Sequence, residues 1–384
     1  MNPAEVRALF PILKKRAYMF SGGIAPASTR TIEAMKKHMD WVTNDADDLY
    51  LHTEDEMQEC RRLFAKLLGA DTDEVAMVES TSAGSNLVVD LLTPAPKGSN
   101  VVFDEWAYPS SVYPWKLKGR ENVQLRFVQP RDGLVHFEDF EAAVDDKTIA
   151  ISVSHVTPGQ GFRHDIGALA KLAHAHNAVL IVDGAQSAGA ADINLHKLGV
   201  DFYSTTAMKW LMGAGGVGFF YCAEKHMDKY PTRAGYASNG GYDLHKFKFL
   251  PSAERFNLGL SNIAGAAFTR PGLEILLETG MKTVEKHVLD LSGYCIAGMR
   301  ERGMDVITPT EPEYRLGVIA AIMPDAKEFW KFLYDRGVDT YFHGNLFRVD
   351  PHVFNNRGDV DRFLEGVDAY QEKGTAAAKA KRKR

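Results

Sequence analysis

The chain has 384 residues, of which 45% are hydrophobic and 25% are charged, and its formal net charge is −5. This length is too great for one simple domain, and the composition is typical of a globular protein with a sizeable core. The charge gives no reason to expect a nucleic-acid partner, and no apolar stretch is long enough to span a membrane. The three cysteines, Cys60, Cys222 and Cys295, form no CxxC pair, which indicates reduced thiols in a cytoplasmic protein.

Helical and strand-like patterns alternate between about Ser21 and Tyr221. Helices are predicted over 55–69, ending at Gly69, and over 85–92 and 165–177. Between them, short apolar runs predict strands at 74–80, 100–105, 148–156, 178–183, 200–205 and 217–222. This alternation is typical of an α/β fold with a mostly parallel sheet that is sandwiched by helices.

The pattern changes after about residue 240. A stretch rich in Gly, Asn and Tyr at 237–243 precedes a long helical segment over 272–303. Short strands at 318–323 and 346–350 follow, with further helices to the end. This change indicates a smaller α+β unit in the C-terminal part of the chain.

We therefore predict two domains and a tail. Residues 20–240 form the large domain, and residues 1–19 join 241–372 in the small domain. The run 373–384 is basic and of low complexity, so it is expected to be a flexible, solvated end rather than a nucleic-acid arm.

Two charged residues follow strands that are predicted to share one edge of the sheet. Asp183 ends the strand at 178–183, and Lys209 comes shortly after the strand at 200–205. Open parallel sheets bind ligands beyond the carboxyl ends of their strands, so we expect both side chains in that crevice. A carboxylate there could ligate a metal, bind a ribose or pair with a protonated pyridine nitrogen, and either residue alone could be structural. A lysine shielded from water tends to lose its proton, as a Schiff-base amine must.

Small polar residues from Ser80 to Asn86 lie between a predicted strand and a predicted helix. Such a helix N-terminus binds phosphate well, although the same residues could form an ordinary helix cap. The glycines from Gly213 to Gly218 precede a strand and not a helix, so they do not form a dinucleotide fingerprint. We expect them where two backbones, or a backbone and a cofactor, come close. The histidines show no metal-ligand spacing, so no metal site is predicted.

Six segments in chain order carry a resemblance to a known family: TSAGSN, EWAYPSSVYPW, SHVTPGQGFRHDIGALA, VLIVDGAQSAGA, DFYSTTAMKWLMGAGGVG and LFRVDPHVFNN. They resemble the class V aminotransferase family of fold-type I pyridoxal-phosphate enzymes, over nearly the whole chain. That family includes cysteine desulfurases, selenocysteine lyases, kynureninases and proteins like isopenicillin N epimerase. The resemblance implies pyridoxal 5'-phosphate as cofactor, an amino-acid substrate and a homodimer.

The resemblance also implies roles for residues around the cofactor ring. Lys209 would carry the cofactor as a Schiff base and move the proton at the substrate α-carbon, and Asp183 would keep the pyridine nitrogen protonated. Gln186 and His155 are expected to hydrogen-bond the phenolic oxygen, although His155 could instead be a structural histidine. Tyr108 is expected to stack on the ring.

The expected phosphate contacts are Thr81, Ser82 and Thr206. Arg348 is expected to bind the substrate α-carboxylate, a task suited to a planar guanidinium. Two positions depart from the family pattern: Met208 stands where many relatives have histidine, and Leu260 stands where a threonine reaches the phosphate of the neighbouring subunit. Ser261 could replace that threonine.

Several reactions remain open. A cysteine desulfurase needs a nucleophilic thiol before Arg348, and the segment 335–347 has no cysteine, so this activity is disfavoured. We predict an aminotransferase or a carbon–sulfur lyase-type β-eliminase, with epimerisation third. A catalytically inactive regulatory protein is a further alternative, which the intact Lys209 and Asp183 oppose. A nucleotide-binding oxidoreductase would need a strand–glycine–helix fingerprint that the sequence lacks.

Overall fold

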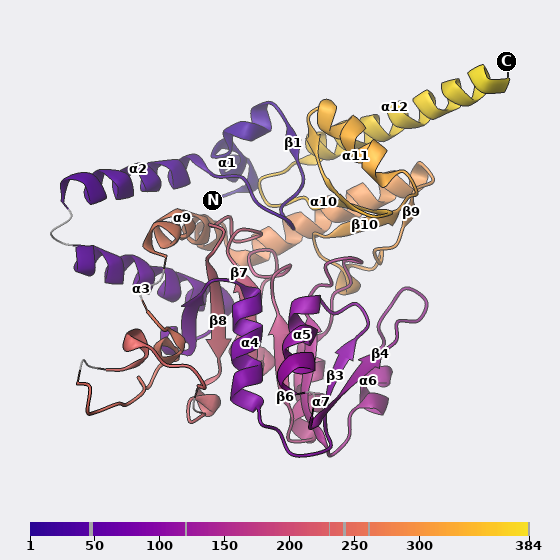
Figure 1. The fold of residues 1–384 in the computed structure, drawn as a ribbon. Coiled ribbons are helices and arrows are strands. Elements are labelled where there is room, and N and C mark those ends of the chain that lie inside the picture. The colour runs from indigo at the N-terminus through magenta and orange to yellow at the C-terminus, as the bar shows by residue number, and fades with distance from the viewer. Residues whose placement is uncertain (46–48, 120, 230, 241–242, 260–261, 383–384) are drawn as a thin grey trace.

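A seven-stranded sheet forms the centre of the computed structural model, which describes residues 1–45, 49–119, 121–229, 231–240, 243–259 and 262–382 (Figure 1). Its strands are β2 (Val75–Val78), β3 (Ser99–Asp104), β4 (Val123–Val128), β5 (Thr148–Ser154), β6 (Val179–Asp183), β7 (Phe202–Thr206) and β8 (Gly218–Cys222). They lie in the order β2-β8-β7-β6-β5-β3-β4. The pairs from β7 to β4 are parallel, whereas β8 is antiparallel to β2 and β7. The predicted mostly parallel sheet is confirmed.

Apolar side chains cover both faces of this sheet. In β6, Leu180 and Val182 belong to one buried cluster and Ile181 to another, because successive residues of a strand point to opposite faces. This explains why β6 is a continuous apolar run rather than an alternating one. The cluster around Ile181 contains residues of α4 (Thr81–Leu92) and α5 (Pro109–Lys118), and the other cluster contains residues of α3 (Leu49–Leu68) and α7 (Ile166–Ala175).

The C-terminal part of the chain forms a smaller antiparallel sheet in the order β12-β13-β10-β9. Its strands are β9 (Asp305–Val306), β10 (Ile319–Ile322), β12 (Tyr341–His343) and β13 (Leu346–Val349). Near the start of the chain, β1 (Ala17–Tyr18) pairs in parallel with β11 (Val338–Asp339). The remaining helices are α1 (Pro3–Ala8), α2 (Thr29–Asn44), α6 (Phe137–Ala143), α8 (Leu195–Leu198), α9 (Ile263–Thr279), α10 (Met281–Glu301), α11 (Ala326–Asp335) and α12 (Arg357–Arg382). The domain boundary near residue 240 stays a prediction.

The long helical segment predicted over 272–303 is two helices. Gly280 separates α9 from α10 with φ +82°, a backbone conformation that favours glycine. Good helix formers on both sides concealed this break, because an isolated glycine is tolerated in a helical pattern. By contrast α3 ends next to Gly69 as predicted, and Gly69 has φ +60°.

The backbone of the basic tail continues α12 as far as Arg382, and this helix extends away from the body of the molecule (Figure 1). Alanine and lysine, which dominate the tail, are good helix formers. Within the described ranges, every helix is too short or too polar to cross a lipid bilayer.

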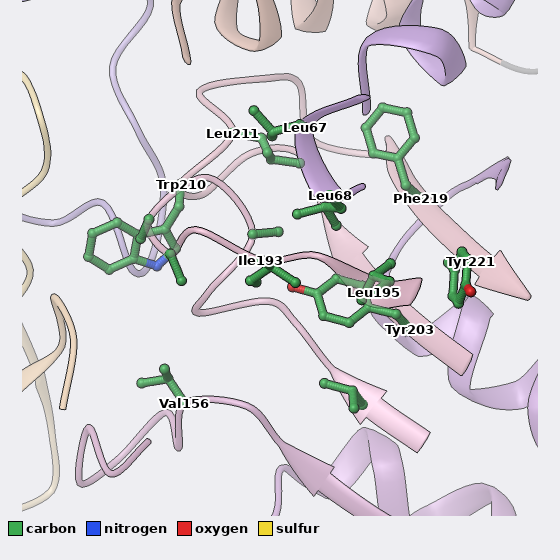
Figure 2. Close-up of a cluster of buried hydrophobic side chains, with 14 of the residues drawn as sticks. Leu67, Leu68, Val156, Ile193, Leu195, Tyr203, Trp210, Leu211, Phe219 and Tyr221 are labelled. Carbon is green, nitrogen blue, oxygen red and sulfur yellow. The ribbon is translucent and has the colours of Figure 1, made fainter. Parts of the chain in front are cut away.

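The segment that follows β7 is anchored in the largest buried cluster. Figure 2 shows Trp210 and Leu211 among the side chains of this cluster, together with Leu67 and Ile193. Trp210 and Leu211 are both completely buried. Burying a large apolar side chain contributes about 1.5–3 kcal/mol, so these two residues hold the backbone immediately after Lys209 in place.

Candidate active site

A pocket with about 540 Å³ of empty space opens where β5, β6 and β7 end and α4 begins. The pocket is lined by Ser80, Thr81, Ser82, Tyr108, Ser154, Val156, Pro158, Asp183, Ala185, Gln186, Thr206, Met208 and Lys209. All the site residues predicted from the sequence except His155 and Arg348 therefore line one pocket.

Lys209 enters the pocket from the connection between β7 and β8. Two backbone hydrogen bonds fix this connection: Ala207 N donates to Val217 O at 2.8 Å, and Met212 N donates to Lys209 O at 3.0 Å. Burial lowers the pKa of Lys209, while the charge of Asp183 raises it. The amine is therefore easier to deprotonate than an ordinary lysine, which favours its use as a nucleophile and base.

Asp183 ends β6 and is buried. Ala185 N donates to its Oδ1 at 2.9 Å. Burial raises the pKa of Asp183, and the Ala185 hydrogen bond and the charge of Lys209 act in the opposite direction. A buried carboxylate is unfavourable without a cationic or hydrogen-bonding partner, so this position suits a protonated ring nitrogen.

The first turn of α4 supplies hydrogen-bond donors to the pocket. Ser80 caps the helix, and its Oγ accepts from Ala83 N at 3.2 Å. Thr81 and Ser82 are the first two helical residues, whose N–H groups have no partner within the helix. Among the described residues, Thr81 Oγ1 is buried without a hydrogen-bond partner, whereas Ser82 Oγ donates to Ser110 Oγ at 2.8 Å. This arrangement fits a phosphate group.

Glycine lets α4 lie directly against β7. A Cβ on Gly84 would come within 2.2 Å of Ser204 Oγ, so a larger residue would push the helix away from the sheet. Thr206, at the end of β7, makes only a long contact of 3.5 Å from its Oγ1 to Val217 O. Ser154 Oγ, at the end of β5, is buried and has no hydrogen-bond partner among the described residues. These two hydroxyls are available to a ligand.

Gln186 is held from two sides. Its Oε1 accepts from Trp210 Nε1 at 2.8 Å, and its Nε2 donates to Gly22 O at 2.9 Å. An amide nitrogen carries two hydrogens, so the second one can donate to a ligand. Tyr108 precedes α5 at the mouth of the pocket and is 46% exposed, which leaves its ring accessible to a flat ligand.

His155 does not line the pocket, although its neighbours Ser154 and Val156 do. Its backbone N donates to Asp183 O at 2.9 Å, and its side chain is buried. Burial lowers the pKa of His155, and the charges of Arg163 and His164 lower it further, so the imidazole is neutral. Its Nδ1 has no hydrogen-bond partner among the described residues. Both interpretations of His155, a ligand contact or a structural histidine, remain predictions.

Arg348 is the other predicted residue outside the pocket lining. It lies on β13 and is buried, and its Nη1 donates to the carbonyl of Pro158 at 2.8 Å. Pro158 lines the pocket, and the charge of Arg348 acts on the pKa of Lys209, so the guanidinium lies next to the pocket. Its Nε donates to Asp350 Oδ2 at 3.0 Å, and its Cζ lies 4.9 Å from the centre of the Tyr341 ring.

The two departures from the family pattern have different outcomes. Met208 lines the pocket, and its thioether cannot donate a hydrogen bond there. Its backbone O accepts from Ala25 N at 2.8 Å, which ties the lysine segment to the N-terminal part of the chain. Leu260 and Ser261 lie outside the described residues.

The sequence analysis missed three residues of this region. Ser154 ends β5 at the same edge of the sheet as Asp183, so the rule that found Asp183 could have found it. Asp350 follows Arg348 by two positions, and the period of a strand places such residues on one face. Gly22 contacts Gln186 across a separation of 164 residues, for which the sequence carries no local signal.

One group of potential metal ligands lies outside the pocket. Oxygen and nitrogen atoms of Asp71, Glu74 and His196 come within 4.8 Å of one another. Glu74 already accepts hydrogen bonds from the backbone of Asp71 and Glu224. This geometry alone does not identify a metal site.

The donors and acceptors of the pocket suit three parts of pyridoxal phosphate: its phosphate, its pyridine nitrogen and its aldehyde. The first turn of α4, with the unpartnered Thr81 Oγ1, suits the phosphate. Asp183 suits the pyridine nitrogen, and Lys209, whose pKa burial lowers, suits the aldehyde. The fold and this pocket define an enzyme that uses pyridoxal phosphate.

Comparisons with known proteins identify the family. The chain belongs to the class-V aminotransferase family, whose model matches residues 17–338. An uncharacterized aminotransferase, YcbU, of Bacillus subtilis (strain 168) is 25% identical over 369 residues, which is 96% of this chain and 98% of the relative. A cysteine desulfurase of Escherichia coli (strain SE11) is 26% identical over 395 residues, with 94% of this chain and 97% of the relative covered. The apo structure of a cysteine desulfurase from Thermococcus onnurineus NA1 has a TM-score of 0.88 and 25% identity, and covers 97% of this chain and 99% of its own. The predicted family, fold and cofactor are confirmed.

Proposed function

We propose that this enzyme acts at the α-carbon of an amino acid, and that it is an aminotransferase or a carbon–sulfur lyase-type β-eliminase. The observation that carries the proposal is that Lys209 and Asp183 line one pocket together with Thr81 and Ser82, the first helical residues of α4, which suit a phosphate group. The family supports both activities, since the relatives described above include an aminotransferase and cysteine desulfurases. Epimerisation ranks third.

Two residues would handle the protons of the reaction. Bound pyridoxal phosphate supplies an electron sink for the charge that develops when the α-proton leaves. Lys209 Nζ, with its lowered pKa, takes that proton and returns it at a second atom. Asp183 holds the proton on the pyridine nitrogen, because its buried carboxylate needs a cationic partner.

The other residues would bind and orient. Thr81 and Ser82 at the start of α4, with Thr206, hold the phosphate. The remaining hydrogen on Gln186 Nε2 is donated to the phenolic oxygen of the cofactor, and His155 would hydrogen-bond the same oxygen. Tyr108 covers the ring and excludes water. Arg348 binds the substrate carboxylate with the guanidinium hydrogens that Pro158 and Asp350 leave free.

A desulfurase that carries sulfur as a protein persulfide is not part of the proposal. All three cysteines of the chain are buried, and none lines the pocket. Burial raises the pKa of Cys295 to about 12 and raises the pKa values of Cys60 and Cys222 as well. Reactive thiols are exposed and have low pKa values. Several relatives are named cysteine desulfurases, so the comparisons do not support this exclusion, and it rests on the buried thiols alone.

The proposed reactions can be separated in one assay. Purified holoenzyme is incubated with single amino acids, and three products are followed: transfer of the amino group to an added 2-oxo acid, release of ammonia with pyruvate, and loss of optical rotation. Transfer or ammonia release is expected. Loss of rotation alone would replace the proposal with epimerisation, and no reaction with any amino acid would favour the regulatory alternative.

Two controls test the residues. Borohydride treatment should fix the cofactor to Lys209 in a peptide map, and Lys209→Ala should abolish both this attachment and turnover. Lys171→Ala, at an exposed lysine of α7, should change neither. After incubation with cysteine, a persulfide on Cys60, Cys222 or Cys295 would refute the argument against a desulfurase.

A homodimer and a cytoplasmic location also belong to the proposal. The family resemblance supports the dimer, and the three free cysteines support a reducing compartment. Light scattering of the purified holoenzyme tests the first, with a monomer as the contrary result.

A further inference from the structure

We propose that Asp350 controls the charge of the substrate-carboxylate site, so that binding of an amino-acid carboxylate at Arg348 is coupled to uptake of one proton by Asp350. The inference rests on the proposed role of Arg348 and deepens it. In this proposal an anionic substrate binds when Asp350 is protonated. The step is balanced, since one proton from solvent adds to the Asp350 carboxylate as the substrate carboxylate binds.

The two side chains form a buried ion pair. Arg348 Nε donates to Asp350 Oδ2 at 3.0 Å, and only 7% of the Arg348 side chain and none of the Asp350 side chain is exposed. Arg348 Nη1 is separately held by the carbonyl of Pro158. The Pro158 carbonyl therefore positions the guanidinium, and the negative charge of Asp350 balances its positive charge.

The carboxylate of Asp350 is incompletely paired. Its Oδ1 is buried and has no hydrogen-bond partner among the described residues. The N-terminal segment closes over Asp350, because a Cβ on Gly22 would lie 2.6 Å from Oδ2. Burial raises the pKa of Asp350 to about 6, although Arg348, the charge of Lys209 and a hydrogen bond from the Gly22 backbone act in the opposite direction. Oδ1 can therefore receive a proton near neutral pH.

The groups that face Asp350 come from three elements. Arg348 on β13 and Lys209 after β7 are the cations, and both lower the pKa of Asp350. Tyr18 on β1 is neutral, because burial raises its pKa to about 12. The segment from Phe20 to Gly22 contributes no charged side chain.

A substrate carboxylate changes this balance. With Asp350 ionised, the pair is neutral, and a bound carboxylate would place two anions on one guanidinium. Two carboxylates that share one guanidinium repel each other, and this repulsion raises the pKa of one of them. Asp350 therefore takes up a proton when the ligand carboxylate binds. Asparagine at this position copies the protonated form, because its amide oxygen can still accept from Arg348 Nε.

The test uses propionate, a monocarboxylate without an amine, and isothermal titration calorimetry of the holoenzyme in two buffers of different ionisation enthalpy. We expect the wild-type Kd to rise by up to about tenfold per pH unit above the Asp350 pKa of about 6, with uptake approaching one proton per propionate. Asp350→Asn should bind propionate up to about a hundredfold more tightly than wild type at about pH 8, two pH units above the Asp350 pKa of about 6, without this pH dependence or proton uptake. Asp339→Asn, which removes the partner of Arg16 away from the pocket, should behave as wild type.

Arg348→Gln separates the inference from the proposed function. If its affinity for propionate equals that of wild type, Arg348 is not the carboxylate-binding residue, and both its proposed role and the inference fail, while the proposed chemistry at Lys209 stands. If Arg348→Gln loses binding but Asp350→Asn binds no more tightly, only the inference is overturned. Should Asp350→Asn fail to retain cofactor, the proton count of the wild type decides: binding without proton uptake at about pH 8 refutes the coupling.

Discussion

Replacement of Trp210 by phenylalanine tests whether the core beneath the pocket holds Gln186 in its binding orientation. Trp210 is completely buried, and its indole Nε1 donates to Gln186 Oε1 at 2.8 Å. Phenylalanine fills part of the same space but has no donor. The change should therefore affect both the stability of the fold and the affinity for the cofactor.

The size of the effect follows from two contributions. A buried acceptor left without a partner costs about 1–3 kcal/mol. Gln186 is only 3% exposed, so water cannot easily replace the lost donor. The smaller ring loses roughly 1–2 kcal/mol of apolar burial. We expect a total loss of about 2–5 kcal/mol in the free energy of unfolding.

The assay is urea unfolding of the apoenzyme, combined with cofactor titration. Trp115→Phe is the control, since Trp115 is also buried but belongs to the cluster on the α4 and α5 side of the sheet. It should lose only the burial contribution and leave the cofactor Kd unchanged. Trp210→Phe should weaken cofactor binding because Gln186 can turn away.

A double-mutant cycle with Gln186→Met isolates the hydrogen bond. Methionine keeps the volume of Gln186 but removes the acceptor, so Trp210→Phe should cost about 1–3 kcal/mol less in this background. Additive losses within about 0.5 kcal/mol would refute the reasoning, because they would mean that the Trp210–Gln186 contact contributes nothing.

Other positions give further tests. Gly22→Ala would place a Cβ 2.6 Å from Asp350 Oδ2, so we expect a loss of about 1–3 kcal/mol in thermal or urea unfolding and weaker cofactor binding; wild-type stability would contradict the close approach. Gly84→Ala, with a Cβ 2.2 Å from Ser204 Oγ, should displace α4 and raise the Kd for inorganic phosphate in the apoenzyme. Burial opposes the charge of Asp201, but hydrogen bonds from two histidines, a lysine and a backbone amide lower its pKa overall. A depressed pKa stabilises the fold above the unfolded value and loses this effect as pH falls, so the deficit of Asp201→Asn, about 3–5 kcal/mol at neutral pH, should shrink below about pH 4 in urea unfolding. A constant deficit would argue against an ionised Asp201.

The sequence was sufficient where a local pattern and a general rule of the fold coincide. Asp183 and Lys209 were predicted to meet because both follow strands at the carboxyl edge of a parallel sheet, and both line the pocket. The sequence could not predict that β8 runs antiparallel to β7, because the side-chain pattern of a buried strand is the same in both directions.

Contacts between distant segments could not be predicted. The bond from Gln186 to Gly22 and the pairing of β1 with β11 depend on how the two ends of the chain pack, which no local pattern records. His155 and Arg348 were singled out by resemblance, and neither is among the residues that line the pocket. The period of a strand places Arg348 and Asp350 on one face, but only the coordinates show that this face is buried.

The position of β1 has a consequence for the order of assembly during synthesis. β1, a few residues before Gly22, leaves the ribosome ahead of its partner β11, which is made about 320 residues later. The wall behind Gln186 and Asp350 is therefore completed only when translation of the small sheet is almost finished. Cofactor loading should thus be a late event, and a nascent chain that ends before β11 should bind pyridoxal phosphate weakly although it already contains Lys209.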